Sequence, residues 1–227
     1  MCRLCWVGVF PFPAAEGVLY AAFLWWDIKI GGSGSNSIKY AAILLCGLFA
    51  LLWAAFGGGD RLVAAAMLLT GGADTFLLEL NVHYEAGLLL FCGVQACYFL
   101  RLYRTCGRSL WGLRLLLLGL SLGALCIVDL WEPLNLLALL YFTSFVCNIL
   151  LSRFCAGKEM KCFAVGLCLF LCCDLCVAAY QFPQMLPQAV FEFVRVGMWL
   201  FYLPGQVLIA LSGLPKSKFW RDEYENQ

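Results

Sequence analysis

Two aspartates inside apolar segments are the residues of this sequence best suited to chemistry. Asp74 lies in segment 68–80 and Asp174 in segment 169–178, and apolar residues dominate both segments. A charged carboxylate at the centre of a membrane helix costs about 3 kcal/mol, so intramembrane acids usually face a cavity, a partner or a substrate. Paired carboxyl groups also suit acid–base chemistry, because one can give a proton while the other stays ionised. We therefore predict that Asp74 and Asp174 form the active centre.

The composition indicates an integral membrane protein. The chain is 63% hydrophobic and 13% charged, against about 45–50% and 25% in soluble proteins. A net charge of +1 leaves no basic footprint for nucleic acid, so we expect no nucleic-acid partner. Most of the 14 cysteines fall in apolar runs, where Cys behaves as a small hydrophobe. We predict neither a metal site nor a cofactor.

Eight segments are long and apolar enough to cross a hydrocarbon core of about 30 Å. The sequence therefore predicts an all-α fold, a polytopic transmembrane helix bundle in one domain at 1–215 with a polar tail at 216–227. The predicted spans are 7–26, 40–56, 62–80, 86–102, 110–128, 134–151, 162–180 and 190–211. Pro11, Pro13 and Glu16 interrupt the first span. We retain it because its apolar stretch continues past any signal-peptide cleavage site.

The distribution of lysine and arginine predicts the orientation. With eight spans, one side carries nearly all the bases, and the opposite side carries only Lys29 and Lys39, in the loop before the second span. The positive-inside rule then places both termini in the cytoplasm, with the tail on the same side. The compact loops favour a bacterial cell membrane as the location.

This orientation places the two aspartates at matching depth. Asp74 lies twelve residues after Leu62, where its span begins, and Asp174 lies twelve after Cys162. At about 1.5 Å per residue, both carboxyl groups lie about 18 Å from the inner boundary. Two parallel four-helix repeats, spans one to four and five to eight, would relate them by a pseudo-twofold axis.

Four short motifs follow one another in spans three to eight. They are Gly72-Ala-Asp74-Thr-Phe-Leu-Leu, Gly87-Leu-Leu-Leu-Phe91-Cys-Gly-Val-Gln95-Ala-Cys-Tyr98, Leu169-Phe-Leu-Cys-Cys-Asp174-Leu-Cys-Val-Ala and Tyr202-Leu-Pro-Gly-Gln206-Val-Leu-Ile-Ala210-Leu-Ser212. Their order and spacing resemble the YhhN-like family of eight-span lysoplasmalogenases, whose segments read GD-x-x-L, G-L-x-x-F-x-x-x-H-x-x-Y, S-D-x-x-L-A and Y-x-x-x-Q-x-L-I-A-x-S. Gln95 stands at the position of the family's histidine, and Ala73 and Cys173 replace the small residues before each aspartate.

The resemblance implies hydrolysis of the vinyl-ether bond of a lysoplasmalogen, which releases a fatty aldehyde and a glycerophospho-base. This vinyl-ether lysophospholipid would be the substrate, and membrane lipids would surround the protein. The reaction protonates the alkene carbon, forms an oxocarbenium-like cation, adds water and collapses through a hemiacetal. It needs an acid and a nearby anion or base, as in glycosidases. Asp74 and Asp174 supply this pair, and the sequence does not assign the two roles.

Five further polar residues are candidate substrate-binding groups: Gln95, Tyr98, Tyr202, Gln206 and Arg195. Glutamine can hydrogen-bond but cannot shuttle a proton as histidine does. Tyrosine and glutamine also hydrogen-bond neighbouring membrane helices, so a structural role stays open. Arg195 would meet a phosphate, or pair with Glu192 three residues earlier. The alternative function is a transporter, or a non-catalytic membrane protein whose carboxylate-lined cavity binds a cation or proton. The sequence does not predict the oligomeric state.

Overall fold

A computed structural model describes residues 9–30 and 33–220, and within those ranges the chain forms helices and no strand. The helices in chain order are α2 (Pro11–Lys29), α3 (Asn36–Leu52), α4 (Arg61–Asp74), α5 (Tyr84–Cys106), α6 (Trp111–Val128), α7 (Pro133–Ser152), α8 (Lys158–Tyr180), α9 (Gln188–Ser212) and α10 (Lys216–Phe219). Shorter turns are the 3₁₀ turns η1 (Ser33–Ser35) and η4 (Pro183–Met185) and the π-helical turns η2 (Trp53–Gly57) and η3 (Thr75–Leu80). The all-α prediction is confirmed. Residues 7–8 of the predicted first span and 221–227 of the predicted tail lie outside the described residues.

Seven helices are long and apolar enough to cross a membrane, and they correspond to the predicted spans two to eight. Their ranges, extended by the π-helical turns, are Asn36–Gly57, Arg61–Leu80, Tyr84–Cys106, Trp111–Val128, Pro133–Ser152, Lys158–Tyr180 and Gln188–Ser212. The helix at the predicted first span, α2, is not among them. Its prolines stand in its first turn, where the missing N–H groups break no hydrogen bond, so the helix begins there instead of being interrupted.

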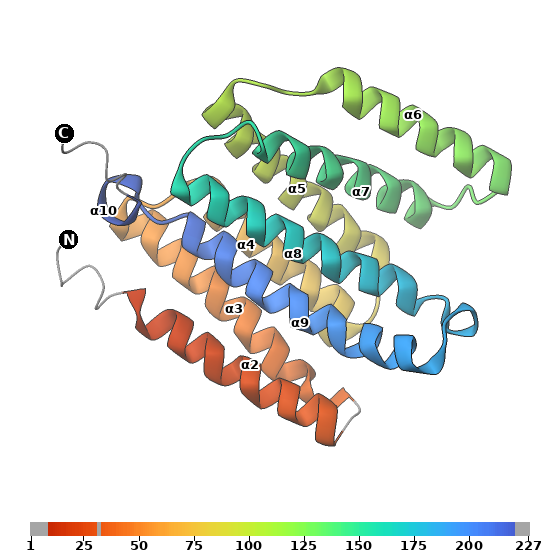
Figure 1. Cartoon of the computed structure of the whole chain (residues 1–227), viewed down its shortest axis with the longest axis horizontal. Coiled ribbons are helices and arrows are strands. Elements are labelled where there is room, and N and C mark those ends of the chain that lie inside the picture. The colour runs from red at the N-terminus through yellow and green to blue at the C-terminus, as the bar shows by residue number, and fades with distance from the viewer. Residues whose placement is uncertain (1–8, 31–32, 221–227) are drawn as a thin grey trace.

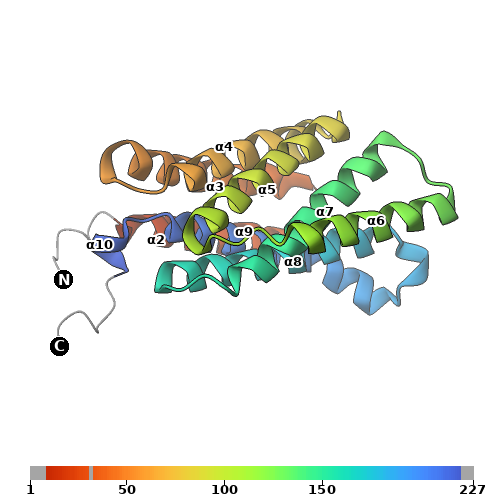
Figure 2. The same cartoon turned by 90° about the horizontal axis from the view of Figure 1, so that it is seen from above.

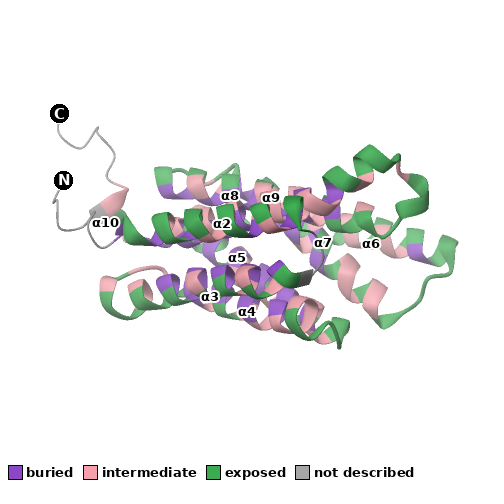
Figure 3. Cartoon of the chain, turned by 90° about the horizontal axis from the view of Figure 1, so that it is seen from below, coloured by how far each residue is buried: buried purple, intermediate pink, exposed green. Residues whose placement is uncertain are grey.

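The long helices lie in two layers (Figure 2). One layer holds α3, α4 and α5, and the other holds α2, α9 and α8, with α7 packed on both α5 and α8. Buried residues face inward between the layers, whereas α6, which packs on α7 at the edge of the bundle, is mostly exposed (Figure 3). In a membrane these exposed apolar faces contact lipid tails as apolar as themselves.

The start of α2 and the short helix α10 lie at the same end of the bundle (Figure 1). The loops before α4, α6 and α8 lie at this end too, and we call it the basic end because it carries Arg61, Arg104 and Arg153. The opposite end is the far end. Phe219 of α10 packs edge-on against Trp53, with ring centroids 5.2 Å apart, so the predicted polar tail begins with a segment docked on the bundle.

The same helix neighbours occur in both halves of the chain. In the first half α2 packs on α3, α3 on α4, and α4 on α5, and in the second half α6 packs on α7, α7 on α8, and α8 on α9. Two four-helix repeats require this adjacency. The repeat itself and the cytoplasmic placement of the termini stay predictions.

Lys39 lies inside α3 and not in a loop before the second span. Lys39 is buried, and its Nζ lies 2.7 Å from Oδ2 of Asp27 on α2 and 4.9 Å from the ring centroid of Trp199. The other carboxylate oxygen of Asp27 accepts a hydrogen bond from the Ser35 hydroxyl. The predicted loop position was wrong: Lys39 lies within α3, where Asp27 on the neighbouring helix supplies a buried counter-charge. This ion pair fastens α2 to α3 near the far end.

Helices α8 and α9 cross closely at two glycines. A Cβ atom at Gly166 would lie 2.9 Å from the carbonyl oxygen of Gly205, and one at Gly205 would lie 3.0 Å from the carbonyl oxygen of Gly166. Small residues at such crossings let the backbones of membrane helices approach. The crossing holds α9 against α8 below both aspartates, on the side of the basic end.

The substitution Gly166→Val is expected to force these helices apart, because the new side chain meets backbone atoms. Overpacking of this kind typically costs about 1–3 kcal/mol. We expect a lower midpoint of thermal unfolding for the purified protein in detergent. Gly119→Val on α6, where an added Cβ meets no neighbouring atom within 4 Å, is the matched control. Equal midpoints in the two variants would contradict the close crossing.

Candidate active site

Asp74 and Asp174 line one cavity with a volume of about 630 Å³. Asp74 is the last residue of α4, and Asp174 lies in the second half of α8, which also runs toward the far end. Pockets that bind small molecules usually measure about 300–1,000 Å³. The structure thus brings the two predicted catalytic residues, one hundred positions apart in sequence, to a single cavity of suitable size.

Each aspartate accepts a hydrogen bond from a tyrosine on another helix. The Tyr202 hydroxyl of α9 donates to Oδ2 of Asp74, and the Tyr141 hydroxyl of α7 donates to Oδ2 of Asp174, both over 2.7 Å. This distance is ordinary for a hydroxyl that donates to an oxygen acceptor. The tyrosines hold each carboxyl group in one orientation.

A π-helical turn follows Asp74 directly. The last residue of α4 is Asp74, and η3 continues the helix from Thr75. The Thr75 hydroxyl donates to the carbonyl oxygen of Gly71 over 2.8 Å, which ties this turn to α4. Single π turns are rare and occur frequently at functional sites. This one carries Leu77 and Leu78 to the wall of the cavity.

Aromatic rings cover the cavity wall between the two carboxyl groups. The rings of Tyr141, Phe91, Phe170 and Tyr202 follow one another with neighbouring centroids 5.7, 5.8 and 5.3 Å apart. Trp199 continues the series 5.4 Å from Tyr202. The faces of aromatic rings attract cations. The wall therefore suits a group that becomes positively charged between the carboxyl groups.

The cavity changes character toward the far end. Apolar side chains of α5, α7 and α8 line its middle, and Asn81, Tyr84 and Gln181 lie at its rim. The Tyr84 hydroxyl donates to Oδ1 of Asn81 over 2.8 Å. Among the residues described, no lysine or arginine lines the cavity. An apolar chain fits the middle of the cavity, and neutral groups that can form hydrogen bonds with a ligand lie at its rim.

A family model matches residues 35–213, from the turn before α3 to the end of α9. The chain belongs to the YhhN family. The matched region contains both aspartates and both of their tyrosines, so the resemblance seen in the four motifs is confirmed. No curated protein and no solved structure matches the chain.

All five predicted substrate-binding residues of this YhhN chain lie within the described ranges. Of these five, Tyr202 alone lines the cavity. Gln95 lies deeper in α5, where its side-chain oxygen accepts a hydrogen bond from Nδ2 of Asn148 on α7 over 2.9 Å. Arg195 pairs with Glu192 at the protein surface, with Nη2 3.0 Å from Oε2. Arg195 and the Gln95 side-chain oxygen thus have partners within the protein, whereas the Gln95 side-chain nitrogen has none among the described residues. Contact of either residue with substrate stays a prediction.

Tyr98 and Gln206 are fully buried on the side of the cavity that faces the basic end. Neither the Tyr98 hydroxyl nor the Gln206 amide has a hydrogen-bond partner among the described residues of the YhhN chain. Neither lines the cavity. A direct contact with substrate stays a prediction for both residues. Because neither lines the cavity, contact with substrate there does not explain why their polar atoms lack partners.

Tyr141 and Trp199 are not predicted from the sequence as residues of the site. Tyr141 lies between Leu140 and Phe142 in an otherwise apolar span, and no spacing within the YhhN sequence sets it apart from the other tyrosines. Its role follows from the packing of α7 on α8, which places its hydroxyl beside Asp174. Only a three-dimensional arrangement supplies that information.

Among the other titratable groups of the YhhN chain, Cys173 and Tyr84 line the same cavity. Glu16 of α2 is buried outside this cavity and accepts a hydrogen bond from the Cys46 thiol, with 3.3 Å between Oε1 and Sγ. The twelve cysteines in the described part are free thiols. The same part holds no group of three or more His, Cys, Asp or Glu residues placed to bind a metal ion.

Proposed function

We propose that this chain is a membrane-embedded hydrolase that cleaves the vinyl-ether bond of a lysoplasmalogen into a fatty aldehyde and a glycerophospho-base. The YhhN family is associated with lysoplasmalogenase activity. The observation that carries the proposal is a pair of carboxyl groups, each held by a tyrosine, at one aromatic-lined cavity. Asp74 and Asp174 act as its acid and base.

The first step is transfer of a proton to carbon. Burial in apolar surroundings disfavours the charged form of a carboxyl group, so one of the two keeps its proton. This group protonates the alkene carbon farther from the ether oxygen, and positive charge develops on the carbon bonded to that oxygen. The ionised carboxylate and the ring faces stabilise this oxocarbenium-like cation.

The later steps restore both carboxyl groups. Water adds to the cation and gives a proton to the ionised carboxylate. The product of this addition is a hemiacetal. The hemiacetal hydroxyl then returns a proton to the first carboxylate as the aldehyde carbonyl forms. The carbon–oxygen bond to glycerol breaks, and the glycerol oxygen takes the proton held by the second carboxyl group. One water is consumed per turnover.

The cavity supports a lysophospholipid bound with its vinyl ether at the carboxyl groups. The apolar walls suit the hydrocarbon chain, and Asn81, Tyr84 and Gln181 at the rim suit the polar headgroup. Apolar lining with a few placed polar groups is the usual construction of such pockets.

Release of fatty aldehyde from a lysoplasmalogen by the purified protein in detergent tests this proposal. We expect aldehyde in proportion to time and to protein. A lysophospholipid with an ester in place of the vinyl ether is the control and should give none. Absence of aldehyde with folded protein would reject hydrolysis. Binding of a cation or proton by the aspartates would then support the transporter or non-catalytic alternative.

Removing either tyrosine hydroxyl is expected to slow the reaction. A hydrogen bond to a charged group contributes about 1.5–3 kcal/mol, so Tyr141→Phe and Tyr202→Phe should each lower kcat about 10- to 100-fold with little change in KM. Tyr40→Phe is the matched control, because the Tyr40 hydroxyl lies 2.8 Å from that of Thr75 and outside the cavity. An unchanged kcat in both cavity variants would show that the tyrosines do not orient the carboxyl groups.

A further inference from the structure

The residues one helical turn beneath Asp74, toward the basic end, are polar. Thr70 lies four residues before Asp74 on α4, and Gln206 lies four residues after Tyr202 on α9. Both side chains are fully buried. The Thr70 hydroxyl and both polar atoms of the Gln206 amide lack a hydrogen-bond partner in the described part of the chain.

The residues one turn beneath Asp174 are aromatic instead. Phe170 lies four residues before Asp174 on α8, and Phe145 lies four residues after Tyr141 on α7. Both phenylalanines are buried, and their ring centroids lie 5.0 Å apart. Each carboxyl group therefore has a tyrosine partner of its own, but the residues one turn below differ, since they are polar under Asp74 and aromatic under Asp174.

The register of α4 and α9 places the two orphaned side chains opposite each other. Near the basic end, Val63 Cγ1 lies 3.0 Å from the position of a Cβ atom at Gly213. The hydrogen bond of Asp74 lies eleven residues farther along both helices. Thr70 and Gln206, which lie between these contacts, therefore face each other without bonding. Buried polar groups left unpaired cost about 1–3 kcal/mol each, and internal water is the usual partner of such groups.

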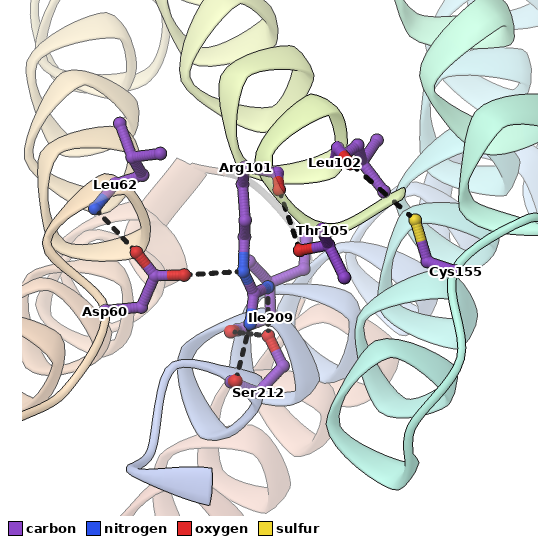
Figure 4. A network of polar contacts seen from close by, with 8 residues as sticks. All are labelled: Asp60, Leu62, Arg101, Leu102, Thr105, Cys155, Ile209 and Ser212. Atoms are coloured by element: carbon purple, nitrogen blue, oxygen red, sulfur yellow. Dashed lines mark hydrogen bonds and ion pairs between the residues drawn. The ribbon is translucent and has the colours of Figure 1, made fainter. Parts of the chain in front are cut away.

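Polar groups continue from this point to the basic end. The Tyr98 hydroxyl on α5 is also buried without a partner among the residues described. The Tyr98 ring packs edge-on against the Phe163 ring, with centroids 5.2 Å apart. The Arg101 guanidinium carbon lies 4.4 Å from the centroid of the Phe163 ring. Helical side chains lean toward the N-terminus of their helix, so Tyr98 leans toward the cavity. Arg101 in turn bonds Asp60 and Ser212 at the basic end (Figure 4).

From this arrangement we infer that a row of internal water molecules, bound by Thr70, Gln206 and Tyr98, connects Asp74 with the Arg101 network at the basic end. Four polar atoms of the three side chains are available to these waters, namely the two hydroxyl oxygens and the oxygen and nitrogen of the amide, and none has another partner in the described chain. The row reaches the cavity beside Asp74 alone, since phenylalanines occupy the equivalent places beneath Asp174.

This water row assigns the two catalytic roles, an assignment that rests on the proposed function. Water reaches the cation from the side of Asp74, so Asp74 receives the proton of the attacking water. Asp174, with aromatic residues one turn below, gives its proton to the alkene carbon. In the collapse of the hemiacetal, Asp174 regains a proton from the hydroxyl group, and Asp74 passes its proton to the glycerol oxygen.

Radiolytic hydroxyl-radical labelling in H₂¹⁸O tests the water row without any turnover. Radicals formed from bound water oxidise the nearest side chains, and mass spectrometry locates the ¹⁸O. We expect Tyr98 to be labelled in the folded protein and Phe145, which is buried to the same extent, to stay unlabelled. Labelling of Tyr98 should fall several-fold in Gln206→Leu and further in Thr70→Val/Gln206→Leu, and stay unchanged in Thr143→Val on α7. If Tyr98 in the wild type is as unreactive as Phe145, the water row is overturned. This comparison uses the wild type alone, so it holds even if a variant fails to fold.

Rescue by azide tests the assignment of roles. Azide adds to the cation in place of water, forms a carbon–nitrogen bond and needs no base. We expect azide to raise substrate consumption by Asp74→Ala about tenfold or more, with an α-azido ether as product, and to leave Asp174→Ala inactive. Rescue of Asp174→Ala, or of neither variant, would overturn the assignment. A wild-type protein that releases no aldehyde would reject the proposed function, and the ¹⁸O labelling would still decide the water row.

Discussion

Asp74→Asn and Asp174→Asn should each release fatty aldehyde about 10²- to 10⁴-fold more slowly than the wild type, which is the usual contribution of a positioned acid or base. Asparagine has the size of aspartate, and its amide oxygen can still accept the hydrogen bond that Tyr202 or Tyr141 donates. The amide cannot give or receive the proton that the reaction moves. We therefore expect the loss in kcat, with KM nearly unchanged.

The double variant sharpens this prediction. Residues that act as a unit give strongly non-additive losses, so Asp74→Asn/Asp174→Asn should be little slower than the slower single variant. Glu79→Gln is the control, because this acid lies five residues beyond Asp74 but is exposed and does not line the cavity. A wild-type rate in either aspartate variant would remove that residue from the mechanism.

The second large effect concerns stability. Arg101 is buried at the basic end, where its Nε lies 2.8 Å from Oδ2 of Asp60, and its two terminal nitrogens lie 2.7 Å from the Ser212 hydroxyl and 2.6 Å from the Ser212 carbonyl oxygen (Figure 4). The guanidinium thus joins the start of α4 to α5 and to the end of α9. Breaking a buried ion pair by removing one partner costs about 3–5 kcal/mol, because the other charge stays behind. Since the Asp60 side chain is 31% exposed, we expect the lower part of this range for Arg101→Met.

Thermal unfolding of the purified protein in detergent checks this prediction. Arg101→Met should lower the midpoint clearly, whereas Arg104→Met, one turn farther along α5 and exposed, should leave it within error. Adding Asp60→Asn to Arg101→Met should restore part of the loss, because it removes the unpaired charge. Equal midpoints for Arg101→Met and Arg104→Met would show that the network is not structural.

The helix bundle and the carboxyl pair are predictable from sequence because each depends on one-dimensional information. A span is a matter of apolar length, and an acid such as Asp74 or Asp174 stands out against its apolar neighbours. The partners of these acids are not predictable in this way. Tyr141 comes to Asp174 only through the packing of α7 on α8, and the neighbouring sequence is equally compatible with a tyrosine that faces lipid.

Charged residues near helix ends show the same limit. Sequence position assigns Lys39 and Arg101 to loops or helix ends, yet both are buried in ion pairs with Asp27 and Asp60. Their partners come from other helices, so the local sequence contains no sign of the pairing. Gln95, predicted at the substrate, meets Asn148 for the same reason. In each of these cases the register between helices decides which polar groups meet.

The position of a single deuterium tests the central claim most directly. If the carboxyl pair protonates the alkene carbon, cleavage of a lysoplasmalogen in D₂O must place one deuterium on the carbon next to the aldehyde carbonyl, because carboxyl protons exchange with solvent. The aldehyde is reduced to the alcohol as it forms, so that later exchange adds none, and mass spectrometry counts the label. We predict one deuterium per aldehyde from the wild type. Aldehyde without deuterium would contradict protonation at carbon and, with it, the proposed role of Asp74 and Asp174.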